Sequence, residues 1–118
     1  AGRTTRSLTE FVDIYPTLCD LAGLDKPSHL EGSSVVPVLK NPQLAAKVSA
    51  IGRFQSGDTI RTDRHRFTLY SDGKGKPVSR MLYDHREDPA ENLNIAELPE
   101  NQDLVRQLTR QLKAGMGK

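Results

Sequence analysis

The sequence has no tryptophan, only three phenylalanines and three tyrosines, and a single cysteine among its 118 residues. The scarcity of aromatics means that a hydrophobic core must rest on Leu, Val and Ile. No apolar run approaches the roughly 18 residues of a membrane-spanning helix, so we expect no membrane association. There is also no basic-then-apolar leader. Because the chain opens with Ala1 instead of Met, we expect a processed or truncated product, and the missing leader says little about its parent.

A long tract of one charge is also absent. Seventeen Lys and Arg nearly balance fifteen Asp and Glu, which leaves a formal net charge of +2. A nucleic-acid-binding domain usually carries a basic stripe, whereas the densest basic stretch here, residues 61–66, is interrupted by Asp63. We therefore expect no nucleic-acid partner.

The single cysteine, Cys19, excludes an internal disulfide and any metal site built on several thiolates. It lies inside an apolar helical pattern, which favours a buried and inert thiol. A hydrophobic fraction of 36% and a charged fraction of 27% are typical of a folded chain.

Residues 8–22 have the periodicity of a helix with two adjacent apolar rows. Pro16 is tolerated only in the first turn, with Asp13 as the N-cap, and Gly23 supplies the C-terminal stop. Apolar residues over so much of the circumference predict a helix that is buried on several sides. The element that covers this helix need not be part of this chain.

The period changes after residue 48 to that of strands, which we expect at 48–54, 59–62, 66–70 and 78–84. A final helix with one apolar stripe is expected from about residue 101 to 114. The predicted fold class is α+β: a four-stranded, mostly antiparallel sheet packed with a C-terminal helix and preceded by the N-terminal helix.

Catalytic motifs are not found. The three histidines lack the spacing of metal ligands, no Gly-x-Ser-x-Gly elbow occurs, and no glycine-rich loop opens a helix. The acidic cluster at 84–91 does not match a calcium loop, and we interpret it as a structural connection. No residue of this chain is predicted to be catalytic or to bind a metal.

Arg61 is more interesting. It alternates with Ile60 along a strand, so the two side chains should lie on opposite faces. A guanidinium group can grip sulfate or carboxylate with two hydrogen bonds. The alternative is a salt bridge to Asp58 or Asp63, and the residues alone favour that alternative.

The order of three segments resembles the type I, formylglycine-dependent sulfatases. Residues 7–24 are similar to the family's "VDIxPTLxxLAGL" helix, residues 32–39 to "GxSLxPLL", and residues 81–93 to "ELYDLxxDPxExxNL". Residues 57–63 and 66–70, together with 27–32, resemble the iduronate-2-sulfatase branch. The match is specific because it spans nearly the whole chain in the right order.

The resemblance implies an alkaline-phosphatase-like α/β domain followed by a smaller C-terminal subdomain. Residues 1–42 would come from the end of the large sulfatase domain, and residues 43–118 would form the C-terminal subdomain. The helix at 8–22 would then pack on the preceding domain, which is the missing partner. Without that domain, we expect the isolated chain to dimerise through residues 8–22, to swap that helix or to leave it poorly ordered.

The family's reaction needs a formylglycine made from Cys or Ser in Cys/Ser-x-Pro-x-Arg, together with calcium. The chain has neither that motif nor the family's Asp-Asp calcium pair, so both cofactors are expected in the parent, which would be a sulfuric ester hydrolase. By resemblance, His29, Arg53 and Arg61 would lie on the rim of the substrate cleft and contact a uronate or sulfate. The parent would be exported: periplasmic, secreted or lysosomal. The alternative is a stand-alone interaction or carbohydrate-binding module with this fold.

Overall fold

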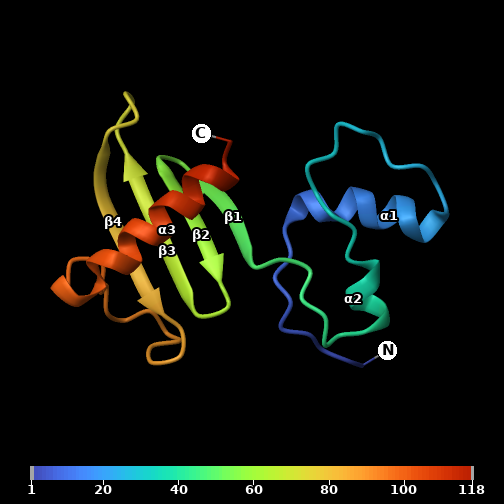
Figure 1. Ribbon diagram of the computed structural model, residues 1–118, viewed down its shortest axis with the longest axis horizontal. Helices are drawn as coiled ribbons and strands as arrows, with labels where there is room; N and C mark the ends of the chain where they lie inside the picture. Colours follow the sequence, from blue (N-terminus) through green and yellow to red (C-terminus); the bar gives the residue numbers. More distant parts are fainter. Residues whose placement is uncertain (1, 118) are drawn as a thin grey trace. The chain divides into compact units, whose positions relative to one another are not determined.

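The computed structural model describes residues 2–117 and divides into two compact units at the boundary between Ala50 and Ile51. The first unit is helical, and the second contains a sheet covered by one helix (Figure 1). The sequence places a domain boundary at 42/43, and the assignment of residues 1–42 to a large sulfatase domain stays a prediction. No helix within residues 2–117 has the length and apolar character that crossing a membrane requires.

The helical unit contains η1 (Phe11–Asp13), α1 (Ile14–Ala22) and α2 (Val36–Lys40). Asp13 is the N-cap residue of α1, and Pro16 lies in its first turn as predicted. The helix ends at Gly23, whose φ of 67° is in the left-handed region that glycine adopts without strain. The expected irregular entry is the short 3-10 turn of η1.

A buried carboxylate organises this unit. Asp13 is 2% exposed, and its side chain accepts hydrogen bonds of 2.8 Å from the backbone N–H groups of Glu10 and Ser33. The ammonium group of Lys47 lies 2.8 Å from Asp13 Oδ1. Burial alone would raise the pKa of Asp13, but the hydrogen bonds from Lys47, Ser33 and Glu10 hold this pKa below its usual value.

The loop between α1 and α2 is held against α1. The Val35 N–H donates to Thr17 Oγ1 at 3.0 Å, and Thr17 Oγ1 donates to the Asp13 carbonyl at 2.6 Å. A Cβ at Gly32 would lie 1.9 Å from the Val12 carbonyl oxygen. The loop can approach the helix this closely only because residue 32 has no side chain.

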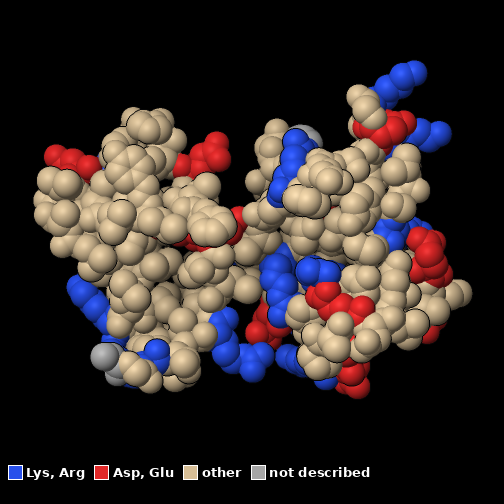
Figure 2. Space-filling model, turned by 180° about the vertical axis from the view of Figure 1, so that it is seen from behind, with Lys and Arg blue, Asp and Glu red and all other residues tan. Residues whose placement is uncertain are grey.

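Within residues 2–117, α1 is covered on one side only, and its burial on several sides by a partner outside this chain stays a prediction. Its buried residues are Pro16, Thr17 and Cys19, and burial of the Cys19 thiol is confirmed. The predicted apolar row is exposed and includes Phe11 at 90% and Leu18 at 57%. Figure 2 shows a broad area without charged side chains over this unit. The reason is that no described element covers this face.

The second unit is built on a sheet with the strand order β1-β2-β3-β4. The strands are β1 (Ser49–Phe54), β2 (Gly57–Thr62), β3 (His65–Ser71) and β4 (Pro77–Asp84). β2 pairs with β3, and β3 with β4, both antiparallel. All four strands were predicted, with ends that differ by one or two residues.

One face of the sheet packs against α3 (Gln102–Gly115), which follows the 3-10 turn η2 (Pro99–Asn101). Ile60, Phe67 and Leu82 lie opposite one another in register and are completely buried. They form a core with the apolar stripe of α3, which consists of Val105, Leu108 and Leu112. The α+β fold class is therefore confirmed.

The connection from β4 to α3 is fixed by its own polar side chains. Asp88 accepts hydrogen bonds from the Leu93 N–H and the Asn92 side chain, and Asn94 Oδ1 accepts one from the Leu82 N–H. Glu91 has a φ of 58°, which is uncommon for a residue with a side chain. The acidic cluster is thus the structural connection expected from the sequence.

Candidate functional site

Arg61 lies on β2 and faces away from α3. Its neighbour Ile60 is in the core, and successive side chains of a strand point to opposite faces. Arg66 on β3 is directly opposite Arg61, and Tyr83 on β4 is directly opposite Arg66. These three side chains therefore share the sheet face that α3 leaves uncovered, as the alternation in the sequence predicts for Arg61.

The guanidinium group of Arg61 forms no hydrogen bond or ion pair with residues 2–117. The salt bridge that the residues alone favoured is therefore wrong for both candidate partners. Asp58 accepts from Arg53, and Asp63 lies 3.7 Å from Arg86 Nη2. Arg61 Nη1 is buried and has no hydrogen-bond acceptor among the described residues.

Arg53 is in a different situation. Its Nε and Nη2 donate to the two Asp58 oxygens at 2.5 and 2.9 Å. This hydrogen-bonded ion pair holds the pKa of Arg53 above its usual value. Asp58 lies two residues before Ile60 on β2, so both side chains point to the sheet face that packs against α3. The Arg53 guanidinium, which binds Asp58, therefore lies on that face as well. The structure thus places the charged groups of Arg53 and Arg61 on opposite faces.

His29 belongs to the helical unit and lies in the turn at 28–29, where its side chain is exposed. It makes no hydrogen bond or ion pair with the described residues. Of the three side chains predicted for the cleft rim, two are on neighbouring strands and one is in the other unit.

Sequence reasoning missed the surroundings of Arg66. Its guanidinium carbon lies 5.5 Å from the centroid of the Tyr83 ring, within the range of a cation–π contact. Its Nη2 pairs with Glu91 Oε2, while Glu91 Oε1 lies 2.5 Å from His85 Nε2. The alternation of Arg66 with Phe67 could have placed it beside Arg61, but no local signal ties Glu91 to it.

A second charged cluster lies at the end of β4. The Arg64 guanidinium donates to both oxygens of Asp84 and holds the pKa of that carboxyl well below its usual range. Burial lowers the pKa of His65, whose Nε2 is 4.0 Å from Asp84 Oδ2. Asp84 also accepts from the Arg86 N–H at 3.0 Å. Its oxygens are therefore satisfied locally, and the cluster stabilises the end of the sheet.

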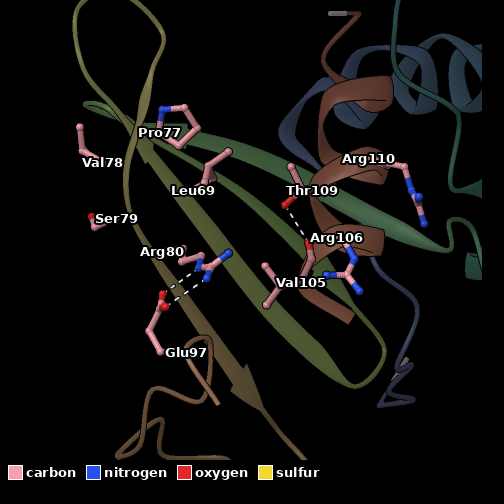
Figure 3. Close-up of a pocket in the computed structure, with 10 residues that line it drawn as sticks. All are labelled: Leu69, Pro77, Val78, Ser79, Arg80, Glu97, Val105, Arg106, Thr109 and Arg110. Atoms are coloured by element: carbon pink, nitrogen blue, oxygen red, sulfur yellow. Dashed lines mark hydrogen bonds and ion pairs between the residues drawn. The ribbon is translucent and has the colours of Figure 1, made fainter. Parts of the chain in front are cut away.

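An open pocket of about 590 Å³ lies between α3 and β4 (Figure 3). Leu69 and Val105 contribute apolar surface, and Arg80 lies across it with its guanidinium bound to Glu97 at 2.7 and 3.0 Å. None of His29, Arg53 and Arg61 lines this pocket. No three His, Cys, Asp or Glu side chains among residues 2–117 form a group that could hold a metal ion.

Comparison with known proteins places this chain in the class of sulfatase C-terminal regions. A sequence model of the family "N-sulphoglucosamine sulphohydrolase, C-terminal" matches residues 1–117, and the chain belongs to this family. The resemblance seen in the three sequence segments is thereby confirmed.

Curated relatives agree with this class. The chain is 33% identical over 97 residues to the Delta 4,5-hexuronate-2-O-sulfatase of Bacteroides thetaiotaomicron, which covers 75% of this chain and 19% of that protein. It is 34% identical over 108 residues to Arylsulfatase K of Rattus norvegicus, with 80% and 19% covered. The chain thus spans about a fifth of the length of these relatives.

Solved structures show the same fold. The phosphonate monoester hydrolase of Agrobacterium radiobacter superposes with a TM-score of 0.78 at 25% identity, covering 99% of this chain and 26% of that one. BT4656, solved with its substrate D-glucosamine-2-N,6-O-disulfate, has a TM-score of 0.75 at 24% identity, with 86% and 22% covered. In these neighbours the matched region is about a quarter of a larger chain.

Proposed function

We propose that this chain is the C-terminal part of a longer sulfatase that hydrolyses sulfate esters of uronic-acid-containing glycans. The family match over residues 1–117 carries the proposal. The name of the Bacteroides relative, a hexuronate-2-O-sulfatase, supports the substrate class. In this proposal the chain acts as scaffold and forms part of the substrate cleft, while bond cleavage belongs to the rest of the protein.

The partner of this chain is then the preceding sulfatase domain. The apolar face formed by Phe11 of η1 and by Ile14, Leu18 and Leu21 of α1 supports this proposal, because all four residues are exposed by half or more. A monomer rarely leaves such a contiguous apolar surface in water. Without the preceding domain, two copies of the chain would associate through residues 8–22.

Formylglycine and calcium would belong to the absent part as well. The residues present do not fit either group: Cys19 is followed by Asp20-Leu21-Ala22-Gly23 and not by the x-Pro-x-Arg sequence. No group of His, Cys, Asp or Glu within residues 2–117 is arranged for a metal ion. No step of the reaction therefore involves a nucleophile or metal ligand of this chain. By the same family resemblance, the longer protein would be exported.

In this proposal the substrate cleft is bordered by His29, Arg53 and Arg61. Arg61 is the best candidate of the three for direct contact with the substrate. Its guanidinium has no acceptor within residues 2–117, whereas Arg53 is neutralised by Asp58. An arginine without a counterion is suited to a uronate or sulfate group of the substrate. Arg53 would have to exchange Asp58 for substrate, which makes its contribution smaller.

The first test is the coding sequence upstream of residue 1. It should encode about 300–400 further residues, a typical length for a large catalytic domain, with a Cys/Ser-x-Pro-x-Arg motif and an export signal. The longer protein should release sulfate from a 2-O-sulfated unsaturated uronate, and the 118-residue chain should release none. Sulfate release by the purified chain alone would overturn the proposal.

The second test is kinetic and uses alanine variants of the longer protein. Arg61→Ala should raise KM by about tenfold with kcat largely kept, because a charge-assisted hydrogen bond to bound substrate is lost. Arg53→Ala and His29→Ala should have smaller effects. Arg86→Ala, which removes an exposed charge paired with Asp63, is the control. Unchanged kinetics in all three rim variants would remove the proposed contact.

A further inference from the structure

Two arginines face each other across neighbouring strands on the sheet face opposite α3. The register places Arg61 of β2 directly against Arg66 of β3. Side chains in directly opposed positions have Cβ atoms about 5 Å apart, and like charges there are destabilising. A folded sheet that keeps this pair needs a compensating negative charge close to both guanidinium groups.

The hydrogen-bond donors of the pair are also incompletely satisfied. Arg61 Nη1 and Arg66 Nε are both buried, and neither has an acceptor within residues 2–117. A buried donor without an acceptor costs about 1–3 kcal/mol, more when the group is charged. The Arg66 side chain as a whole remains 40% exposed, and Arg61 is half-buried, so other parts of both side chains are open to solvent.

The described residues supply one carboxylate to this pair. Glu91 contacts Arg66 through Oε2, and its other oxygen is occupied by His85. Tyr83 covers one side of the Arg66 guanidinium through its ring, which fixes the orientation of the planar group. Glu91 is therefore the carboxylate that pairs with Arg66, and among the described residues no carboxylate forms a hydrogen bond or ion pair with the Arg61 guanidinium.

We propose that Arg61 and Arg66 together bind one oxyanion, a sulfate or carboxylate group, with Glu91 and Tyr83 positioning Arg66. Planar guanidinium groups donate parallel hydrogen bonds to such an ion, and two of them can enclose it from two sides. The inference extends the proposed role of Arg61 and adds Arg66 as its partner. Its test needs no sulfate-ester hydrolysis, so it can fail or succeed independently of the proposed function.

The oxyanion that binds Arg61 and Arg66 can come from two sources. The anion is either a carboxylate side chain from elsewhere in the longer protein or a sulfate or uronate group of the substrate. Both would compensate the pair, but only the second leaves the site open to added sulfate in the longer protein.

The experiment follows the Nε–H signals of the arginines by ¹⁵N NMR while sodium sulfate is added to the 118-residue chain. Sodium chloride at equal ionic strength is the reference. We expect a saturable shift of the Arg61 and Arg66 signals in sulfate. The internal controls are Arg64 and Arg80, whose guanidinium groups are already bound to Asp84 and Glu97. No saturable shift, or equal shifts at all four arginines, would overturn the proposal.

Variants sharpen this result. Arg61→Gln should abolish the saturable shift of the Arg66 signal. Arg61→Lys keeps the positive charge but removes the planar guanidinium group with its two parallel N–H donors, so it should weaken sulfate binding about tenfold. Glu91→Gln keeps a side-chain oxygen that can accept from Arg66 but removes the competing negative charge, so it should strengthen sulfate binding by a similar factor. Retained binding in Arg61→Gln would show that the two arginines do not act together and would refute the site.

The longer protein distinguishes the two sources. Saturable sulfate binding at Arg61 and Arg66 there, competed by a sulfated uronate, assigns the site to the substrate. If the 118-residue chain binds sulfate and the longer protein does not, a carboxylate of the longer protein fills the site. Both results support an oxyanion site, whereas binding in neither protein contradicts it.

Discussion

The two longest helices within residues 2–117, α1 and α3, both carry apolar side chains at helical spacing, but only α3 has its apolar stripe covered. The apolar stripe of α3 lies against the sheet, with Leu108 only 2% exposed. The apolar row of α1 is left in solvent, and the interior of its unit is instead organised around the Asp13 carboxylate and Thr17. The difference shows that the core of the sheet unit is closed by α3, while the helical unit leaves an apolar face exposed, which our proposal assigns to an interface.

The largest effect is expected from the removal of a large side chain from the covered apolar stripe of α3. Leu108→Ala leaves a cavity between α3 and the sheet and should lower the free energy of unfolding of the sheet unit by about 2–5 kcal/mol. Urea unfolding followed through the amide signals of α3 and β3 measures this loss.

The matched control is Leu18→Ala on the exposed row of α1. It should change the stability of the 118-residue chain by less than about 0.5 kcal/mol, yet destabilise the longer protein by several times more if the preceding domain covers this residue. Equal and small effects in both proteins would show that the α1 face is not an interface.

The next largest effect is expected at the buried carboxylate. Asp13→Ala removes one of the two carboxylates that pair with Lys47, the other being Glu10, and leaves the backbone N–H groups of Glu10 and Ser33 without their acceptor, which should cost about 3 kcal/mol. Hydrogen exchange of the α1 amides should rise, while that of α3 stays unchanged. Asp20→Ala, which removes a less buried carboxylate that contacts Lys26 and Ser34, should affect α1 much less and leave α3 unchanged.

A smaller effect is expected at Gly32. A methyl group there would lie 1.9 Å from the Val12 carbonyl oxygen, so Gly32→Ala must displace the loop and should cost about 1–3 kcal/mol. Gly52→Ala is the control, since a Cβ at that position meets no atom within 4 Å. A thermal melt of the helical unit should distinguish the two. A variant at Gly32 as stable as the one at Gly52 would contradict the observed packing.

The weakest effect is a pH dependence of the helical unit. The pKa of Asp13 is lower in the folded protein than its ordinary value of about 3.9. Its stabilisation is therefore complete at neutral pH and is lost as the pH falls below about 4, through the folded pKa. The α1 signals should lose intensity over this range, and Asp13→Asn should remove this part of the dependence.

The strands and the last helix could be predicted because each carries its own pattern. Phe67 and Leu69 alternate with Arg66 and Thr68, and Leu108 recurs with Leu112 every four residues. Pro16 and Gly23 likewise mark the ends of α1 by local rules. These features depend on neighbours in the sequence and on little else.

The site could be predicted only in part. Alternation correctly placed Arg61 on the face away from Ile60, but the choice of Asp58 or Asp63 as its partner was wrong, because Arg53 reaches Asp58 from the adjacent strand. The Arg66–Glu91 ion pair joins residues 25 positions apart through a loop with an unusual backbone angle. Tertiary pairings of this kind leave no periodic signal.

The burial of Cys19 has a practical consequence. Because it is the only thiol in the chain and is 5% exposed within α1, an alkylating reagent should react with it only when that helix opens. The rate of its modification in native buffer therefore reports the opening of the helical unit separately from the sheet. In the longer protein, the same rate would measure how firmly α1 is held in place.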